Sequence, residues 1–202
     1  RLMRENGQAA GYELIDLYED CADAVAWLKS HAAELRIDLT RTAVLGESAG
    51  GYLAAALVTL PIGDSTFFKS AILVNAITDL SDPRWGARIA ARSAHPLLKE
   101  KSKAEKIALL SPTSHITAQT CPTLLFHGEQ DGVVFPFHSL KFFNLLSACG
   151  VKTELDFIAN TSHAFLLAEY MQEHHTPLYA ASVAVAQIDA WLAEQKEEKT
   201  ND

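Results

Sequence analysis

Apolar residues recur with a helical period near both ends of the chain. At the N-terminal end they follow one another at steps of three and four residues, which predicts an amphipathic helix with one face on a core. These residues are Leu14, Leu17, Cys21, Val25, Leu28, Ala32 and Leu35. A similar stripe near the other end predicts the last helix, at Leu178, Ala181, Val185, Ile188 and Leu192. The charged residues 194–202 that follow are expected to fray.

Four short apolar or alternating runs between these helices predict strands. They lie at 42–45, within 67–77, at 123–127 and at 153–157. Small and apolar residues at 49–60 predict a buried helix, and 136–148 reads as another, with Pro136 in its first turn and Gly150 at its exit. Strands that alternate with helices predict an α/β fold, in which helices flank a mostly parallel sheet.

The chain is expected to form one domain, residues 1–202, with a cap insertion. No linker or internal repeat divides the 202 residues. Residues 78–122, between the second and third predicted strands, are too numerous for a plain connection. Residues of about 80–110 are therefore expected to form a cap beside the functional site. Arg84, Arg88 and Arg92 recur in it at every fourth position, on a face that is either solvated or turned to the pocket.

Charge and cysteine content narrow the classes of ligand. The formal net charge is −8, and no basic cluster predicts binding to nucleic acid or to an anionic membrane. No apolar run approaches the ~20 residues of a membrane span. Cys21, Cys121 and Cys149 lack the spacing of metal ligands, so neither a metal nor another cofactor is expected. A small uncharged or cationic ligand fits this composition, which does not distinguish oligomeric states or compartments.

The sequence GESAG, from Gly46 to Gly50, marks the point where a predicted strand becomes a predicted helix. A serine at so tight a turn has a strained backbone, and small neighbours two residues before and after it avoid collisions with adjacent strands. Such a turn raises the Ser48 hydroxyl above the sheet. It also points the N–H groups at the helix start toward a developing oxyanion. Ser48 is therefore the candidate nucleophile, and an inert serine in a glycine-rich turn is the alternative.

A serine hydroxyl needs a base, and the base needs a carboxylate to orient it. Asp131 follows the 123–127 strand by a few residues, and His163 follows the 153–157 strand in the same way. The order Ser48, Asp131, His163 is the one expected of this fold rather than of the trypsin or subtilisin types. The other histidines compete less well. In particular, His127 ends a buried strand and is expected to brace the turn there.

These motifs resemble those of the α/β-hydrolase superfamily. Within it, the chain is most similar to the bacterial acetyl esterases and carboxylesterases related to hormone-sensitive lipase. The matching segments are LGESAGGYLAAAL, SPTSHI, CPTLLFHGEQDGVV and NTSHAF. The resemblance implies that Ser48 is the nucleophile, Asp131 the acid and His163 the base, with the N–H of Ala49 in the oxyanion hole. Glu47 and Trp85 are candidate contacts to substrate.

The chain departs from this family at its beginning. Members carry several strands and an HGGG-like loop before the helix placed here at 14–35, and this sequence has no counterpart to them. The N-terminal part of the sheet and one half of the oxyanion hole are therefore expected to lie outside the sequence.

The leading hypothesis is a serine hydrolase that cleaves carboxylic esters through an acyl-enzyme. The resemblance favours a short acyl group such as acetate, and an acetylated sugar is one substrate that it suggests. A second hypothesis is a peptidase like prolyl oligopeptidase, which shares the GxSxGG and HGxxD arrangement. A third is a non-catalytic binding module that kept the three residues by descent.

Overall fold

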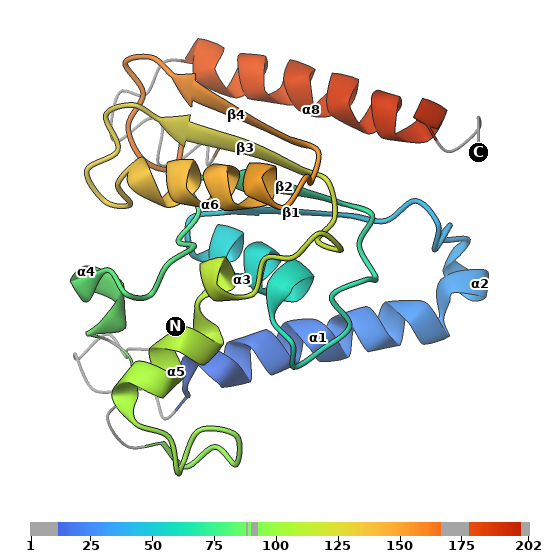
Figure 1. The fold of residues 1–202 in the computed structure, drawn as a ribbon. Coiled ribbons are helices and arrows are strands. Elements are labelled where there is room, and N and C mark those ends of the chain that lie inside the picture. The colour runs from blue at the N-terminus through green and yellow to red at the C-terminus, as the bar shows by residue number, and fades with distance from the viewer. Residues whose placement is uncertain (1–11, 88, 90–92, 167–177, 199–202) are drawn as a thin grey trace.

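A parallel sheet forms the centre of the computed structural model, which describes residues 12–87, 89, 93–166 and 178–198 (Figure 1). In this part of the chain the sheet contains β1 (Ala43–Glu47), β2 (Ser70–Val74), β3 (Thr123–Gly128) and β4 (Thr153–Ile158). Their order is β1-β2-β3-β4, and each neighbouring pair is parallel. The predicted α/β class is confirmed, and all four predicted strands form.

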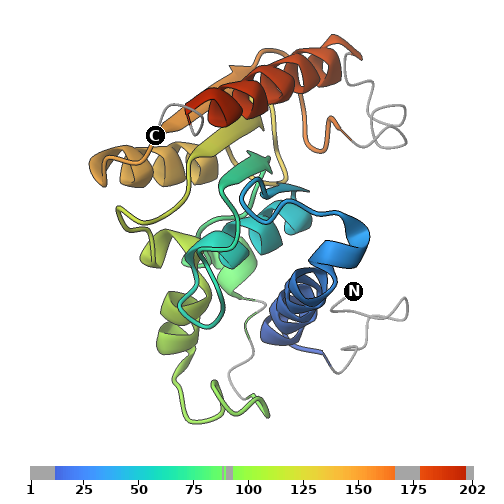
Figure 2. The ribbon, with the colours of Figure 1, turned by 90° about the vertical axis from the view of Figure 1, so that its right-hand side faces the viewer.

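Helices cover both faces of this sheet (Figures 1 and 2). One face carries α8 (Leu178–Glu198), which is packed on Ile72, Val74, Leu124 and Phe126. The other face carries α3 (Ala49–Thr59) and α6 (Phe137–Ala148), which contact Ala71, Leu73 and Leu125. Successive residues of β2 therefore alternate between the two layers, and all five are buried. Because helices cover both faces of the sheet, the central strands are continuous apolar runs in the sequence.

The first predicted helix is divided in two. α1 (Leu14–Ser30) ends at His31, and α2 (Ala32–Leu35) is a separate single turn. The buried residues of α1 are Ile15, Tyr18 and Val25. Val25 belongs to the predicted stripe, but Leu17 and Cys21 are only partly buried, so the packed face is rotated toward Ile15 and Tyr18. Since α1 packs on α3 rather than on the sheet itself, only a narrow face is covered. Leu35, predicted to be in the core, is 44% exposed.

Two other helix boundaries differ from the prediction. Pro136 precedes α6 as its N-cap instead of lying in its first turn. Helix α8 continues through Glu198, so the expected fraying is wrong for residues 194–198, and residues 199–202 lie outside the described part. At the exit of α6, Gly150 has a φ of +73°, the left-handed conformation that glycine adopts at helix ends. In the described ranges no helix is both long and apolar enough to cross a membrane.

The segment between β2 and β3 contains α4 (Pro83–Gly86), α5 (Lys103–Leu110) and a single 3-10 turn, η1 (Pro112–Ser114). It is anchored to α3 by the Tyr52 hydroxyl, which donates to Leu110 O at 3.0 Å. Arg84 forms an ion pair with Asp82. Arg88 and Arg92 fall outside the described residues. The arginine stripe proposed for this segment therefore stays a prediction, as does its role as a cap.

Candidate active site

The carboxyl ends of β1, β3 and β4 carry the three residues that the sequence singles out. Ser48 directly follows β1, Asp131 lies three residues beyond β3, and His163 lies five residues beyond β4. In a parallel sheet these ends meet at one edge, which is where α/β proteins place their sites. The topology thus brings together residues that are 83 and 115 positions apart from Ser48.

Ser48 occupies a strained turn between β1 and α3. Its φ is 56° and its ψ is −117°, values that a non-glycine residue rarely adopts. The turn is fixed by the Ser48 N–H, which donates to Val74 O at 2.9 Å. A Cβ added to Gly46 would come within 2.2 Å of Gly50 O, and one added to Gly51 within 2.7 Å of Ala76 Cβ. These approaches are the physical reason for glycine at positions 46 and 51. The collision predicted at Gly50, two residues after the serine, is wrong, because a Cβ there would meet no atom within 4 Å.

The three side chains form one hydrogen-bonded row. His163 Nε2 lies 2.8 Å from Ser48 Oγ, and His163 Nδ1 lies 2.6 Å from Asp131 Oδ2. The carboxylate can only accept, so Nδ1 carries the ring proton and Nε2 accepts from the serine hydroxyl. Ser48 is partly exposed, whereas His163 and Asp131 are 6% and 3% exposed. The arrangement can therefore pass a proton from the hydroxyl to the imidazole while the carboxylate stays shielded from water.

Asp131 accepts three hydrogen bonds, and a fourth nitrogen lies close to it. Oδ1 accepts the N–H groups of Val133 at 2.8 Å and Val134 at 2.9 Å. Oδ2 faces His163 at 2.6 Å and His127 Nε2 at 3.3 Å. Burial opposes ionisation of this carboxyl, but the hydrogen bonds from His127 and His163 outweigh it and hold its pKa well below the usual range. Asp131 is therefore a carboxylate at neutral pH.

The loop that carries His163 approaches the end of β3 closely. A Cβ on Gly128 would lie 2.4 Å from Thr161 O, so glycine is required at this crossing. The Gln130 N–H donates to Thr161 O at 2.9 Å, which joins the Asp131 loop to the His163 loop. Asn160 and Ala164 adopt φ values of 53° and 59° on either side of the histidine. Both loops are thus fixed relative to each other before any substrate arrives.

The side chain of Glu47 binds the loop that carries His163. Its Oε1 accepts the Leu166 N–H at 3.1 Å, three residues after His163. Burial raises the pKa of Glu47, although the Leu166 N–H and the nearby His163 act in the opposite direction. This contact favours a structural role, and binding of substrate by Glu47 stays a prediction.

Ala49 and Trp85 are placed differently with respect to the serine. Ala49 is the first residue of α3, so its N–H has no acceptor within the helix and points toward the helix start. Trp85, in α4, packs against the cluster around Tyr52 and Leu110. A direct role of Trp85 with substrate also stays a prediction.

Asn75 was not singled out from the sequence. It follows β2 with a φ of 45°, and its Oδ1 accepts the Gly128 N–H at 2.9 Å. It therefore joins the end of β2 to the end of β3, beside the strained serine. The signal in the sequence was an asparagine directly after an apolar strand, since asparagine tolerates the left-handed conformation better than most residues.

One cluster of side chains that could hold a metal ion includes none of the three residues of the row. Asp16, Glu19 and His95 place one ligand atom each within 4.8 Å of one another. These side chains already form hydrogen bonds within the protein. Asp16 accepts the Glu13 N–H, and Glu19 lies 3.0 Å from His95 Nε2. His95 Nδ1 also accepts the Leu97 N–H, which is unfavourable for a histidine that would ligate a metal through Nε2.

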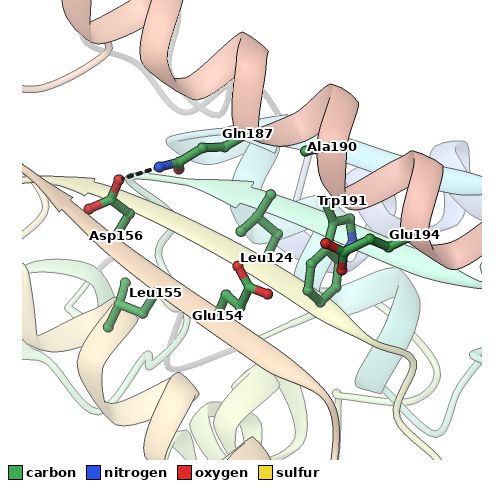
Figure 3. Close-up of a pocket in the computed structure, with 8 residues that line it drawn as sticks. All are labelled: Leu124, Glu154, Leu155, Asp156, Gln187, Ala190, Trp191 and Glu194. Atoms are coloured by element: carbon green, nitrogen blue, oxygen red, sulfur yellow. Dashed lines mark hydrogen bonds between the residues drawn. The ribbon is translucent and has the colours of Figure 1, made fainter.

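A surface pocket of about 160 Å³ lies between β4 and α8 (Figure 3). Its walls include the carboxylates of Glu154, Asp156 and Glu194, and Gln187 donates to Asp156 at 2.9 Å. The pocket is lined by none of the three residues of the row. It is therefore separate from the chemistry at the strand ends.

Comparison with known proteins shows the family and the fold of the chain. The sequence model of the Prolyl oligopeptidase family matches residues 16–198. A probable carboxylic ester hydrolase, LipM of Mycobacterium tuberculosis, is 28% identical over 177 residues, which are 79% of this chain and 40% of that protein. The chain thus spans less than half the length of this relative.

Solved structures of one esterase are examples that share the fold. The native structure of a thermophilic esterase, Est2 of Thermogutta terrifontis, has a TM-score of 0.68 at 25% identity and covers 95% of this chain and 68% of that one. The same esterase phosphorylated by paraoxon gives a TM-score of 0.70 at 25% identity, with the same coverage. The chain belongs to the prolyl oligopeptidase family, and its fold is that of the α/β-hydrolases.

Proposed function

We propose that the protein is a serine hydrolase that cleaves carboxylic esters through an acyl-enzyme. The observation that carries this proposal is the row of Ser48, His163 and Asp131, with distances of 2.8 and 2.6 Å. Ser48 Oγ attacks the ester carbonyl carbon while its proton passes to His163 Nε2. The Asp131 carboxylate stabilises the imidazolium that forms. His163 then protonates the departing alcohol, and a water molecule releases the acid by the reverse route.

The start of α3 supplies stabilisation for the tetrahedral intermediate. Ala49 N–H donates to the oxyanion, and the positive end of the helix dipole points to the same place. This role makes Ala49 a contributor through its backbone, so its side chain can vary if it stays small.

Esters are preferred to peptides because both named relatives are esterases. LipM is named a probable carboxylic ester hydrolase, and the Thermogutta protein is an esterase. The finer proposal is a short acyl group, such as acetate, with an acetylated sugar as one candidate. It rests on the resemblance to acetyl esterases. The family description favours a second candidate, a serine peptidase related to prolyl oligopeptidase.

The test compares ester and amide turnover by the same protein. We expect hydrolysis of p-nitrophenyl acetate and no cleavage of a prolyl p-nitroanilide peptide. A series from acetate to decanoate then tests the short-acyl proposal, which predicts that kcat/KM falls with chain length. Faster amide than ester cleavage would favour the peptidase. A folded protein without turnover of either substrate would favour the binding module.

A further inference from the structure

The imidazole of His127 lies directly behind the aspartate of the row. It projects from β3, is 0% exposed, and makes contacts through both ring nitrogens. Nε2 lies 2.8 Å from Val134 O and 3.3 Å from Asp131 Oδ2, and Nδ1 lies 2.7 Å from Ser139 Oγ. His127 thus joins the strand, the loop that carries Asp131 and the first turns of α6.

The partners of the ring determine where its proton lies. Val134 O and the Asp131 carboxylate can only accept, so Nε2 must carry a hydrogen. Ser139 can donate its hydroxyl hydrogen to Nδ1, which satisfies a neutral ring. The Nε2–H donates to the backbone carbonyl of Val134 at 2.8 Å, and Asp131 Oδ2 lies 3.3 Å from the same nitrogen. His127 consequently presents a fixed donor to the same oxygen that accepts from His163.

We propose that His127 is a positioning residue, which acts on the reaction by holding the Asp131 carboxylate with a second imidazole N–H. The inference rests on the proposed function, because it assigns a task to the carboxylate of that mechanism. The Val133 and Val134 N–H groups hold Oδ1, and His163 and His127 share Oδ2. Without His127, Oδ2 keeps only His163 as a partner, and the position of the carboxylate is less well fixed. The Val134 carbonyl would also lose its donor.

Loss of His127 is expected to lower kcat and to leave KM nearly unchanged. His127 is fully buried, so it does not contact substrate and its loss should leave KM nearly unchanged. A misaligned Asp131 would weaken the orientation of His163, and kcat should fall. One hydrogen bond to a charged group corresponds to a loss of about 10- to 100-fold. Burial opposes ionisation of Asp131, and the His127 bond counteracts it, which agrees with this view.

Two substitutions separate the donor from the bulk of the ring. His127→Leu removes the N–H and fills most of the space, whereas His127→Gln keeps an amide N–H near the position of Nε2. We expect kcat to fall about 10- to 100-fold in His127→Leu and to recover most of that loss in His127→Gln. If His127→Leu does not fold, Ser139→Ala replaces it, because that variant removes only the partner of Nδ1. A several-fold lower kcat is expected there.

The chain offers a matched control in His138. It is also 0% exposed, and its Nε2 lies 3.2 Å from the buried Asp82 Oδ2, a carboxylate outside the row. His138→Leu therefore removes a buried histidine bonded to a buried aspartate and leaves Asp131 untouched. We expect its kcat to stay within about twofold of the parent protein. An equal loss of kcat in both leucine variants would overturn the proposal, since general loosening would then explain it.

A second readout does not depend on ester turnover. The His163 Nδ1–H that bonds to Asp131 should give a proton NMR resonance far downfield, identified by its absence in Asp131→Asn. We expect His127→Leu, or Ser139→Ala in its place, to shift or broaden this resonance and His138→Leu to preserve it. An unchanged resonance in the His127 or Ser139 variant would contradict the positioning role. A shifted resonance in a protein without esterase activity would instead contradict the proposed function alone.

Discussion

Replacing Ser48 or His163 with alanine is expected to lower kcat/KM for p-nitrophenyl acetate by about 10⁵- to 10⁶-fold. The two side chains act as one unit, because the hydroxyl is a nucleophile only while Nε2, 2.8 Å away, can take its proton. The double variant should therefore be no slower than either single variant. What remains would come from the oxyanion donors and from binding of the ester.

The control for this experiment is His31→Ala. His31 lies at the junction of α1 and α2, where its ring stacks on Trp27. Its substitution should leave turnover within about twofold, and circular dichroism should be unchanged in all variants. A Ser48→Ala protein that keeps a tenth of the parent rate would exclude Ser48 as the nucleophile.

Replacing Gly46 with alanine is expected to have the largest effect on folding. The new Cβ would lie 2.2 Å from Gly50 O and 2.5 Å from Gly50 C, both of them backbone atoms in the first turn of α3. Neither β1 nor α3 can move without loss of the Ser48 turn. The backbone atoms cannot move away from the new Cβ. This overpacking should lower the free energy of unfolding by at least about 3 kcal/mol.

Gly50→Ala is the matched control for Gly46→Ala. It lies four residues away, and its added Cβ would meet no atom within 4 Å. Alanine is also the better helix former, so this variant should gain about 0.5–1 kcal/mol. Urea unfolding measures both variants. Equal midpoints for the two proteins would show that the close approach at Gly46 does not limit the fold.

The sequence predicts the positions of the three residues of the row because each follows a predicted strand at once or within a few residues. GESAG lies between a visible strand and a visible helix, and Asp131 and His163 each follow a predicted strand within a few residues. In a parallel sheet such positions converge without further information. The structure brings all three together, and their chemical roles remain proposals.

The contacts that support the row were not available from the sequence. Asn75 bonds to Gly128, and Glu47 bonds to Leu166, across 53 and 119 positions. No local period links such pairs, so only the folded chain reveals them. The expectation that His127 braces the turn indicated the right region. Its contact with Asp131 depends on how the loop at 129–134 folds back on β3.

Periodicity located the helices but not their buried faces. The predicted stripe and the one through Ile15 and Tyr18 are both apolar. The second is buried against α3, whereas Leu17 and Cys21 of the first are only partly buried and Val25 is buried. The choice depends on where α3 lies, which the local pattern does not contain. The charged end of α8 was likewise expected to fray but remains helical through Glu198.

The measurement that tests the central claim most directly is mass spectrometry of the protein during turnover. Rapid acid quenching with p-nitrophenyl acetate in excess should trap an acetyl group on one peptide, with the adduct on Ser48. The adduct should be absent in Ser48→Ala and should decay once the substrate is consumed. Ester hydrolysis with no adduct on Ser48, or with an adduct on another residue, would contradict the acyl-enzyme mechanism proposed for this site.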